Sequence, residues 1–359
     1  MWRGRAFYVT RPTITEDTVD PRPTHVRMDE PAGPLERGFE IDAVARVVRI
    51  LTFVDATVTP ERADALRQWA FRRNAVAMAR AYGTVVDEVG AARAAAGDMD
   101  GVTGRGERVV HVVVRAMRIL HAAALDDEPM PPEAVVEAFD ALRSFEGRPA
   151  DDTTRAALQS VAERVSEIVN ELSDPSGPTA GMAASEALAD IPELADTGMG
   201  AMIVDTVDPI LLGLAFGSRT PLPAVADVPS DADAPGALAR AAAAASAIER
   251  ADAEMTVATR TVSRAMADTF MIEALAEVIV GRPVFVWRTV VEAGIVGGDS
   301  ARLFVNSALA AGVVRSLDPK RKSGRVFAFP AAVSLGMADV VPAQVIGLTG
   351  RGLDGDRTD

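Results

Sequence analysis

Apolar residues recur at steps of three and four through much of the chain, and this spacing constrains the fold more than any other feature of the sequence. In Ile41–Leu51, for example, the apolar side chains fall on one face of a helix. Pro60 and Pro132 are each followed by glutamate, a pair typical of the first turn of a helix. The sequence therefore predicts a mainly α fold. Its multi-helix domain would span residues 39–218, with four or five helices between residues 40 and 172.

Prolines and charges mark the parts of the chain that we expect to lie outside helices. Residues 219–236 are rich in proline and aspartate and predict an exposed linker. From Ala237 to Val280 there is neither proline nor glycine, so residues 237–281 predict one long helix or two stacked helices, a candidate for dimerisation. Residues 1–38 predict an extended or mobile arm, and residues 338–359 a tail.

Composition excludes several classes of protein. The chain has no cysteine, which rules out disulfides, thiolate nucleophiles and cysteine-based zinc sites. Its net charge of −14 disfavours a protein that coats nucleic acid over its whole surface, although a local basic site remains compatible. No apolar run follows the basic start, and the apolar stretch Met199–Ser218 is interrupted by Asp205, Asp208 and Pro209. We expect a cytoplasmic protein without membrane contact.

Motifs for cofactors or metals do not occur in the sequence. His111 and His121 lie in apolar helical stretches without a second histidine at ligand spacing, so both are interpreted as helix-packing residues. We therefore expect no metal, no cofactor and no catalytic residue. Four arginines near Trp69 predict a solvated basic helix face: Arg67, Arg72, Arg73 and Arg80.

Residues 282–337 follow a different pattern, in the order helix, turn, helix, strand, turn, strand, which is the order of a winged helix-turn-helix. The predicted elements are a helix over Val284–Ala293, a turn over Gly294–Gly298, a helix from an N-cap at Asp299–Ser300 to about Ala311, a strand over Val313–Leu317, a turn over Asp318–Gly324 and a strand over Arg325–Phe329.

The second of these helices has two distinct faces. We expect the apolar face to pack on the first helix through Ala301, Phe304, Val305 and Ala308. The opposite face carries Ser300, Arg302, Leu303 and Asn306 near the helix start. In a recognition helix this region meets base edges, where arginine pairs with guanine and asparagine with adenine.

Charge supports this interpretation. Residues 282–336 hold eight basic and three acidic residues, a net charge of +5, so the rest of the chain carries −19. The predicted DNA-contacting residues are Ser300, Arg302 and Asn306 in the major groove, with Arg315, Lys320, Arg321, Lys322 and Arg325 on the phosphates.

The segments IVGGDSARLFVNSALAAGVV and SGRVFAFPAAVSL resemble the winged helix-turn-helix that ends many Fic-family proteins. Fic enzymes that transfer AMP need the motif H-P-F-x-x-G-N-G-R, whose histidine deprotonates the target hydroxyl. This chain has no such motif, so the resemblance covers about 55 residues and implies the DNA-binding fold without the enzymatic activity.

These features predict a transcriptional regulator that binds duplex DNA through a C-terminal winged helix-turn-helix and forms a homodimer. Two alternatives remain open at this point. The chain can be a Fic-like relative with a degenerate or remodelled active site, or an adaptor whose winged helix binds a protein partner. We favour a non-enzymatic role.

Overall fold

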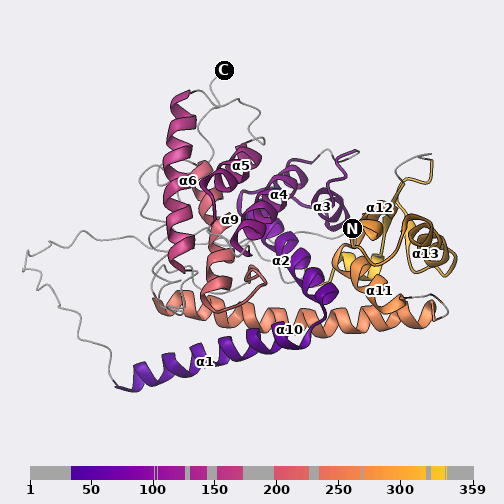
Figure 1. The fold of residues 1–359 in the computed structure, drawn as a ribbon, viewed down its shortest axis with the longest axis horizontal. Helices are drawn as coiled ribbons and strands as arrows, with labels where there is room; N and C mark the ends of the chain where they lie inside the picture. The colour runs from indigo at the N-terminus through magenta and orange to yellow at the C-terminus, as the bar shows by residue number, and fades with distance from the viewer. Residues whose placement is uncertain are drawn as a thin grey trace, which may run out of the picture.

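The computed structural model describes residues 34–100, 102, 104–125, 130–143, 152–172, 198–225, 234–267, 269, 271–320, 325–335 and 337. In this part of the chain the fold is mainly helical, as predicted, with one small sheet (Figure 1). Residues 34–38, predicted as part of an extended arm, instead begin the first helix, because Pro34 is tolerated in a first turn. Residues 1–33 and the predicted tail lie outside the described residues.

The described chain between residues 34 and 172 forms six helices, against the four or five predicted. The additional helix, α3, has only eight residues, too few to show a periodic pattern. Its N-cap is Asp87, whose carboxylate accepts from Gly90 N at 2.8 Å. The helices are α1 (Pro34–Thr57), α2 (Pro60–Ala81), α3 (Glu88–Ala95), α4 (Arg105–Leu125), α5 (Pro132–Arg143) and α6 (Asp152–Leu172).

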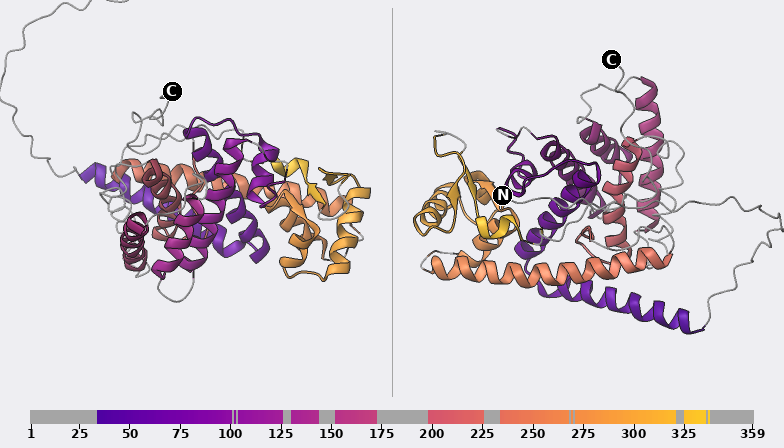
Figure 2. Two further views of the ribbon diagram at one scale, coloured as in Figure 1. Left: turned by 90° about the horizontal axis from the view of Figure 1, so that it is seen from above. Right: turned by 180° about the vertical axis from the view of Figure 1, so that it is seen from behind.

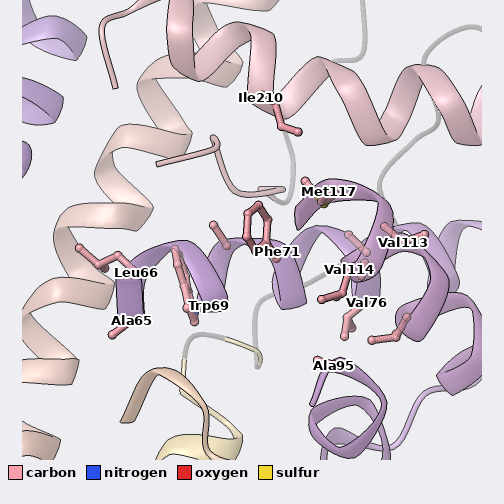
Figure 3. Packing of buried hydrophobic residues seen from close by; sticks show 14 of the residues in the cluster. Ala65, Leu66, Trp69, Phe71, Val76, Ala95, Val113, Val114, Met117 and Ile210 are labelled. Atoms are coloured by element: carbon pink, nitrogen blue, oxygen red, sulfur yellow. The ribbon is translucent and has the colours of Figure 1, made fainter. Parts of the chain in front are cut away.

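Helix α2 lies at the centre of the described core. It packs against α4 and against α9 (Gly198–Ala215), and Figure 3 shows Phe71 of α2 near Met117 of α4 and Ile210 of α9. One apolar cluster includes residues from Val47 of α1 to Met337, so the helices and much of the C-terminal unit share a core. A second, small cluster joins Ala92 of α3 to residues 284, 326, 328 and 333.

Residues 237–281 form two helices rather than one. Helix α10 (Ala234–Ala265) and helix α11 (Ile272–Gly281) are separated by a turn in which Met271 adopts a left-handed backbone conformation with φ of 54°. Helix α11 packs closely on α2 at Gly281. A Cβ added at this position would lie only 2.4 Å from Ala65 Cα. Glycine is therefore required at this contact.

The prediction of an exposed linker over residues 219–236 is wrong for its described parts. Residues 234–236 begin α10, and residues 220–223 are buried against α2. Helix α2 satisfies part of the backbone of this strap, which we define as residues 219–225. Asn74 donates to the carbonyl of Leu222 at 3.1 Å and accepts from the amide of Ala224 at 2.6 Å. Proline-rich composition indicates an absence of helix but does not reveal such partners.

His121 of α4 also holds the strap, and its ring nitrogen Nε2 lies 2.8 Å from the carbonyl oxygen of Arg219. The ring packs edge-to-face on Phe71 with centroids 5.4 Å apart. His111 similarly contacts the carbonyl oxygen of Ala94, through Nδ1 at 3.0 Å. Both contacts agree with the helix-packing interpretation.

Burial lowers the pKa of His121 to about 4, whereas an exposed histidine titrates near ~6.5. Below pH ~6.5 the unfolded chain therefore binds a proton that the folded chain excludes. We expect protonation of His121 to have no effect on the free energy of unfolding above pH ~6.5. As the pH falls from ~6.5 towards ~4, the free energy of unfolding should decrease by about 3 kcal/mol.

The measurement is urea unfolding of the wild-type protein and of His121→Gln, whose amide can still donate to Arg219, at several pH values between about 4 and 7.5. The difference between the two curves isolates the histidine from other titrating groups. Parallel curves across this range would contradict the expected linkage.

Candidate nucleic-acid interface

The C-terminal elements form a compact unit at one end of the molecule, opposite α6 (Figure 2). After α11 the unit contains β1 (Val284–Val286), α12 (Trp287–Glu292), α13 (Gly298–Ala310), β2 (Arg315–Ser316), β3 (Val326–Ala328) and the short helix α14 (Pro330–Val333). The three strands form one antiparallel sheet in the order β1-β3-β2.

Both strands of the hairpin are shorter than predicted, and two helix starts also differ from the prediction. Val284–Val286 was predicted as the start of a helix but forms strand β1, because these residues pair with β3 and Phe285 packs on Phe327 with ring centroids 5.9 Å apart. Helix α13 is capped by Gly297 rather than by Asp299–Ser300, which places Asp299 in the first turn. An acidic side chain there favours the helix electrostatically.

Helix α13 has the two faces that its sequence predicts. The buried face, which lies against α12, consists of Ala301, Phe304, Val305 and Ala308. The exposed face consists of Ser300, Arg302, Leu303 and Asn306. Leu303 is 67% exposed on this face.

Arg302 does not extend freely from this face. Its guanidinium lies over the ring of Trp287 in α12, 4.5 Å from the ring centroid. Stacking leaves the edge of the guanidinium, which carries the N–H donors, available for a ligand. The sequence interpretation missed this contact, because tryptophan in an apolar helix gives no signal for a partner 15 positions later.

The hairpin formed by β2 and β3 carries basic residues beside α13. Arg315 in β2, Lys320 after it and Arg325 just before β3 are all exposed. Arg321 and Lys322 lie outside the described residues.

The hairpin is also held to the helical core by an ion pair. Asp318 Oδ2 lies 3.1 Å from Arg93 Nη2 of α3, and the same nitrogen lies 2.8 Å from Asp98 Oδ2. The pair anchors Asp318, the one acidic side chain of the hairpin, to α3.

The prediction that four arginines of α2 form a solvated basic face is wrong for two of them. Arg72 and Arg73 are buried, with exposed fractions of 4% and 1%, and Arg73 stacks on Trp69. Their long side chains cross the interior to reach carbonyl oxygens of segments distant in sequence, Ala332 for Arg72 and Ala224 for Arg73. Local charge patterns cannot indicate such partners.

Comparison with known proteins gives no match: no family model matches the chain, and no curated protein shows significant similarity to it. In the described part of the structure, no group of three or more acidic or histidine side chains is arranged to hold a metal ion. None of the described helices is both long and apolar enough to cross a bilayer.

Proposed function

We propose that the C-terminal unit is a winged helix-turn-helix that binds duplex DNA, and that the protein is a transcriptional regulator acting in the cytoplasm. The observation that carries the proposal is the combination, on one small unit, of a polar exposed face on α13 and a basic hairpin beside it. The remainder of the chain carries −19, so this segment differs from the rest of the chain in the sign of its net charge. A localised basic surface is what phosphate contact requires.

In this proposal the first turns of α13 enter the major groove. Arg302, held in place by Trp287, would donate two hydrogen bonds to a guanine, and Asn306, one turn later, would pair with an adenine. Ser300 would contact the base edge or phosphate at the start of the helix. Because the stack with Trp287 restricts the rotamers of Arg302, less side-chain entropy is lost when it binds.

The hairpin would hold the phosphate backbone. Its contacts carry affinity and salt dependence rather than sequence information. The proposed phosphate-binding residues are Arg315, Lys320, Arg321, Lys322 and Arg325.

Two copies would bind two half-sites, as helix-turn-helix dimers do. The dimer contact that we propose runs along α10, where Val257 is 64% exposed.

The proposal is tested by fluorescence anisotropy with mixed-sequence duplex DNA between about 0.05 and 0.2 M salt. We expect Lys320/Arg321/Lys322→Ala to weaken binding on the order of 100-fold at 0.1 M salt and to reduce the slope of log K against log salt by about 3. Loss of counterion release at each replaced charge explains both effects.

The matched control is Arg46/Arg49/Arg164→Ala, which removes the same charge from exposed positions on α1 and α6. It should leave the slope unchanged. If the wild-type protein binds no duplex at low salt, or if both triple variants bind equally, the proposed function is wrong.

A further inference from the structure

Three arginines from different elements meet in a cleft between the helical core and the C-terminal unit. The arginine cleft, as we call it, has a volume of about 280 Å³ and is lined by polar side chains of α2, α4 and α12 and of the segment that follows α11. The polar side chains that line it are Gln68, Arg72, Arg118, Arg282, Thr289 and Glu292. This volume suits a small molecule rather than a macromolecule.

Arg72 is the buried charge of this cleft. Its side chain makes one hydrogen bond, from Nη2 to the carbonyl oxygen of Ala332 at 3.3 Å. Its Nε and Nη1 atoms are buried and have no hydrogen-bond partner among the described residues. Burial lowers the pKa of Arg72 to about 10, so the guanidinium is still charged at neutral pH. A buried charge without an acidic partner in contact is costly, and an anion in the cleft would lower that cost through its charge.

The other two arginines are only partly compensated. Arg118 directs both Nε and Nη2 to the amide oxygen of Gln68, at 3.0 and 2.6 Å, and this partner carries no charge. Burial, and next the positive charge of Arg282, lower the pKa of Arg118 to about 10. Arg282 pairs with Asp64 at 3.1 Å.

Acidic groups near the cleft do not cancel this charge. Asp64 is shared between Arg282 and Arg67, which it meets at 3.1 and 3.6 Å. Glu292 lines the rim and is exposed, and Glu88 acts on Arg72 only at longer range. Among the lining residues three are arginine and one is acidic, so the cleft favours an anion.

We infer that the arginine cleft binds a small phosphate ester, which the positive charges of the three lining arginines, Arg72, Arg118 and Arg282, attract and hold. A guanidinium group can donate two parallel hydrogen bonds to two oxygens of one phosphate. A phosphate has more oxygens and more negative charge than a carboxylate, so it can engage several arginines at once. Thr289 offers an uncharged polar group to the remainder of the ligand, whereas the amide of Gln68 is engaged with Arg118 and Asp64.

The position of the cleft gives the ligand a regulatory role, and this step rests on the proposed function. Arg72 and Arg118 belong to the helical core, whereas Thr289 and Glu292 belong to α12, which supports the recognition helix α13. A ligand held by both sides would alter the position of α12 relative to α2. Binding of the ester and binding of DNA should then be coupled.

Thermal unfolding of the full-length protein tests the site, with ribose 5-phosphate and inorganic phosphate as probes and chloride used to keep the ionic strength constant. We expect ribose 5-phosphate to raise Tm of the wild-type protein in proportion to the logarithm of its concentration. Arg72→Met should abolish this shift and should itself have a higher Tm without ligand, because it removes an unsatisfied buried charge.

Arg118→Gln is a second variant, which tests the site even if Arg72→Met does not fold. We expect it to weaken ester binding at least tenfold. Arg46→Met, an exposed position on α1, is the matched control and should respond as the wild type does. Equal shifts in the wild type and both cleft variants would show only the general stabilisation by phosphate salts and would overturn the inference. Stabilisation by inorganic phosphate without any by the ester would also overturn it.

The regulatory step has a separate readout, which is DNA anisotropy at saturating ribose 5-phosphate. A change in DNA affinity of fivefold or more in the wild type, and none in Arg72→Met, supports the coupling. If the ester binds and DNA affinity is unchanged, the regulatory role is wrong while the anion site stands. If no duplex binds at all, the proposed function fails independently of the site.

Discussion

Replacing Arg62 by leucine is expected to lower the free energy of unfolding by about 3–5 kcal/mol, because it leaves a buried carboxylate without its partner. Arg62 Nη2 lies 2.7 Å from Glu277 Oε1, and the two residues are only 6% and 9% exposed. The same arginine reaches Asp252 and Thr259 of α10, so it joins α2, α10 and α11. Burial already raises the pKa of Glu277, and Arg62 opposes that rise.

The double variant Arg62→Leu/Glu277→Leu separates the ion pair from the packing around it. It should recover most of the loss, since an apolar pair of similar volume does not have to be desolvated. Arg164→Leu is the matched control for an exposed pair, because Arg164 and Glu167 are 55% and 61% exposed, and it should change stability by less than about 0.5 kcal/mol. Urea unfolding measures all three. A loss below about 1 kcal/mol in Arg62→Leu would contradict the role assigned to this pair.

Trp69→Ala should have an effect of similar size, about 3–5 kcal/mol. The indole is 1% exposed at the centre of α2, and its Nε1 donates to the carbonyl oxygen of Leu335 at 3.1 Å. The side chain therefore ties the segment after α14 to the core, and Arg73 stacks on its ring 5.6 Å from the centroid. Truncation would leave a cavity, an unpaired carbonyl and an uncovered guanidinium.

The variant Trp69→Phe separates the contribution of ring packing from that of the hydrogen bond to Leu335. It keeps most of the ring but loses the donor, so we expect a loss of about 1–3 kcal/mol from the unpaired carbonyl of Leu335 and the smaller ring. Denaturant unfolding with constant m-values would show that only the folded state has changed. Equal stability of Trp69→Phe and Trp69→Ala would contradict the assigned ring packing.

The helical architecture was predictable because amphipathic helices repeat their apolar residues along one face. The buried and exposed faces of α13 follow directly from that spacing, and the prediction is confirmed at Phe304 and at Asn306. The hairpin of β2 and β3 was predictable from its turn composition. Strand β1 was not, because a short apolar run such as Val284–Val286 is compatible with a buried strand or with a helix.

What the sequence could not reveal depends on contacts between distant segments. Whether an arginine on α2 is solvated depends on what covers it, and Arg72 is covered by elements more than 200 residues later. For the same reason, the sequence could not predict that Asn74 holds the buried strap or that Arg302 stacks on Trp287. No local pattern of charge or proline encodes these tertiary partners.

The most direct test of DNA binding by α13 uses the absence of cysteine from the chain, which makes any introduced thiol unique. Ser300→Cys places a thiol on the exposed first turn of α13, and Ser160→Cys places one on the exposed surface of α6 at the far end of the molecule. The rate of alkylation of each is measured with and without saturating duplex DNA. We predict that DNA slows the reaction at Ser300→Cys at least tenfold and leaves Ser160→Cys unchanged. Binding of duplex with an unchanged rate at Ser300→Cys would show that α13 is not the DNA-contacting helix.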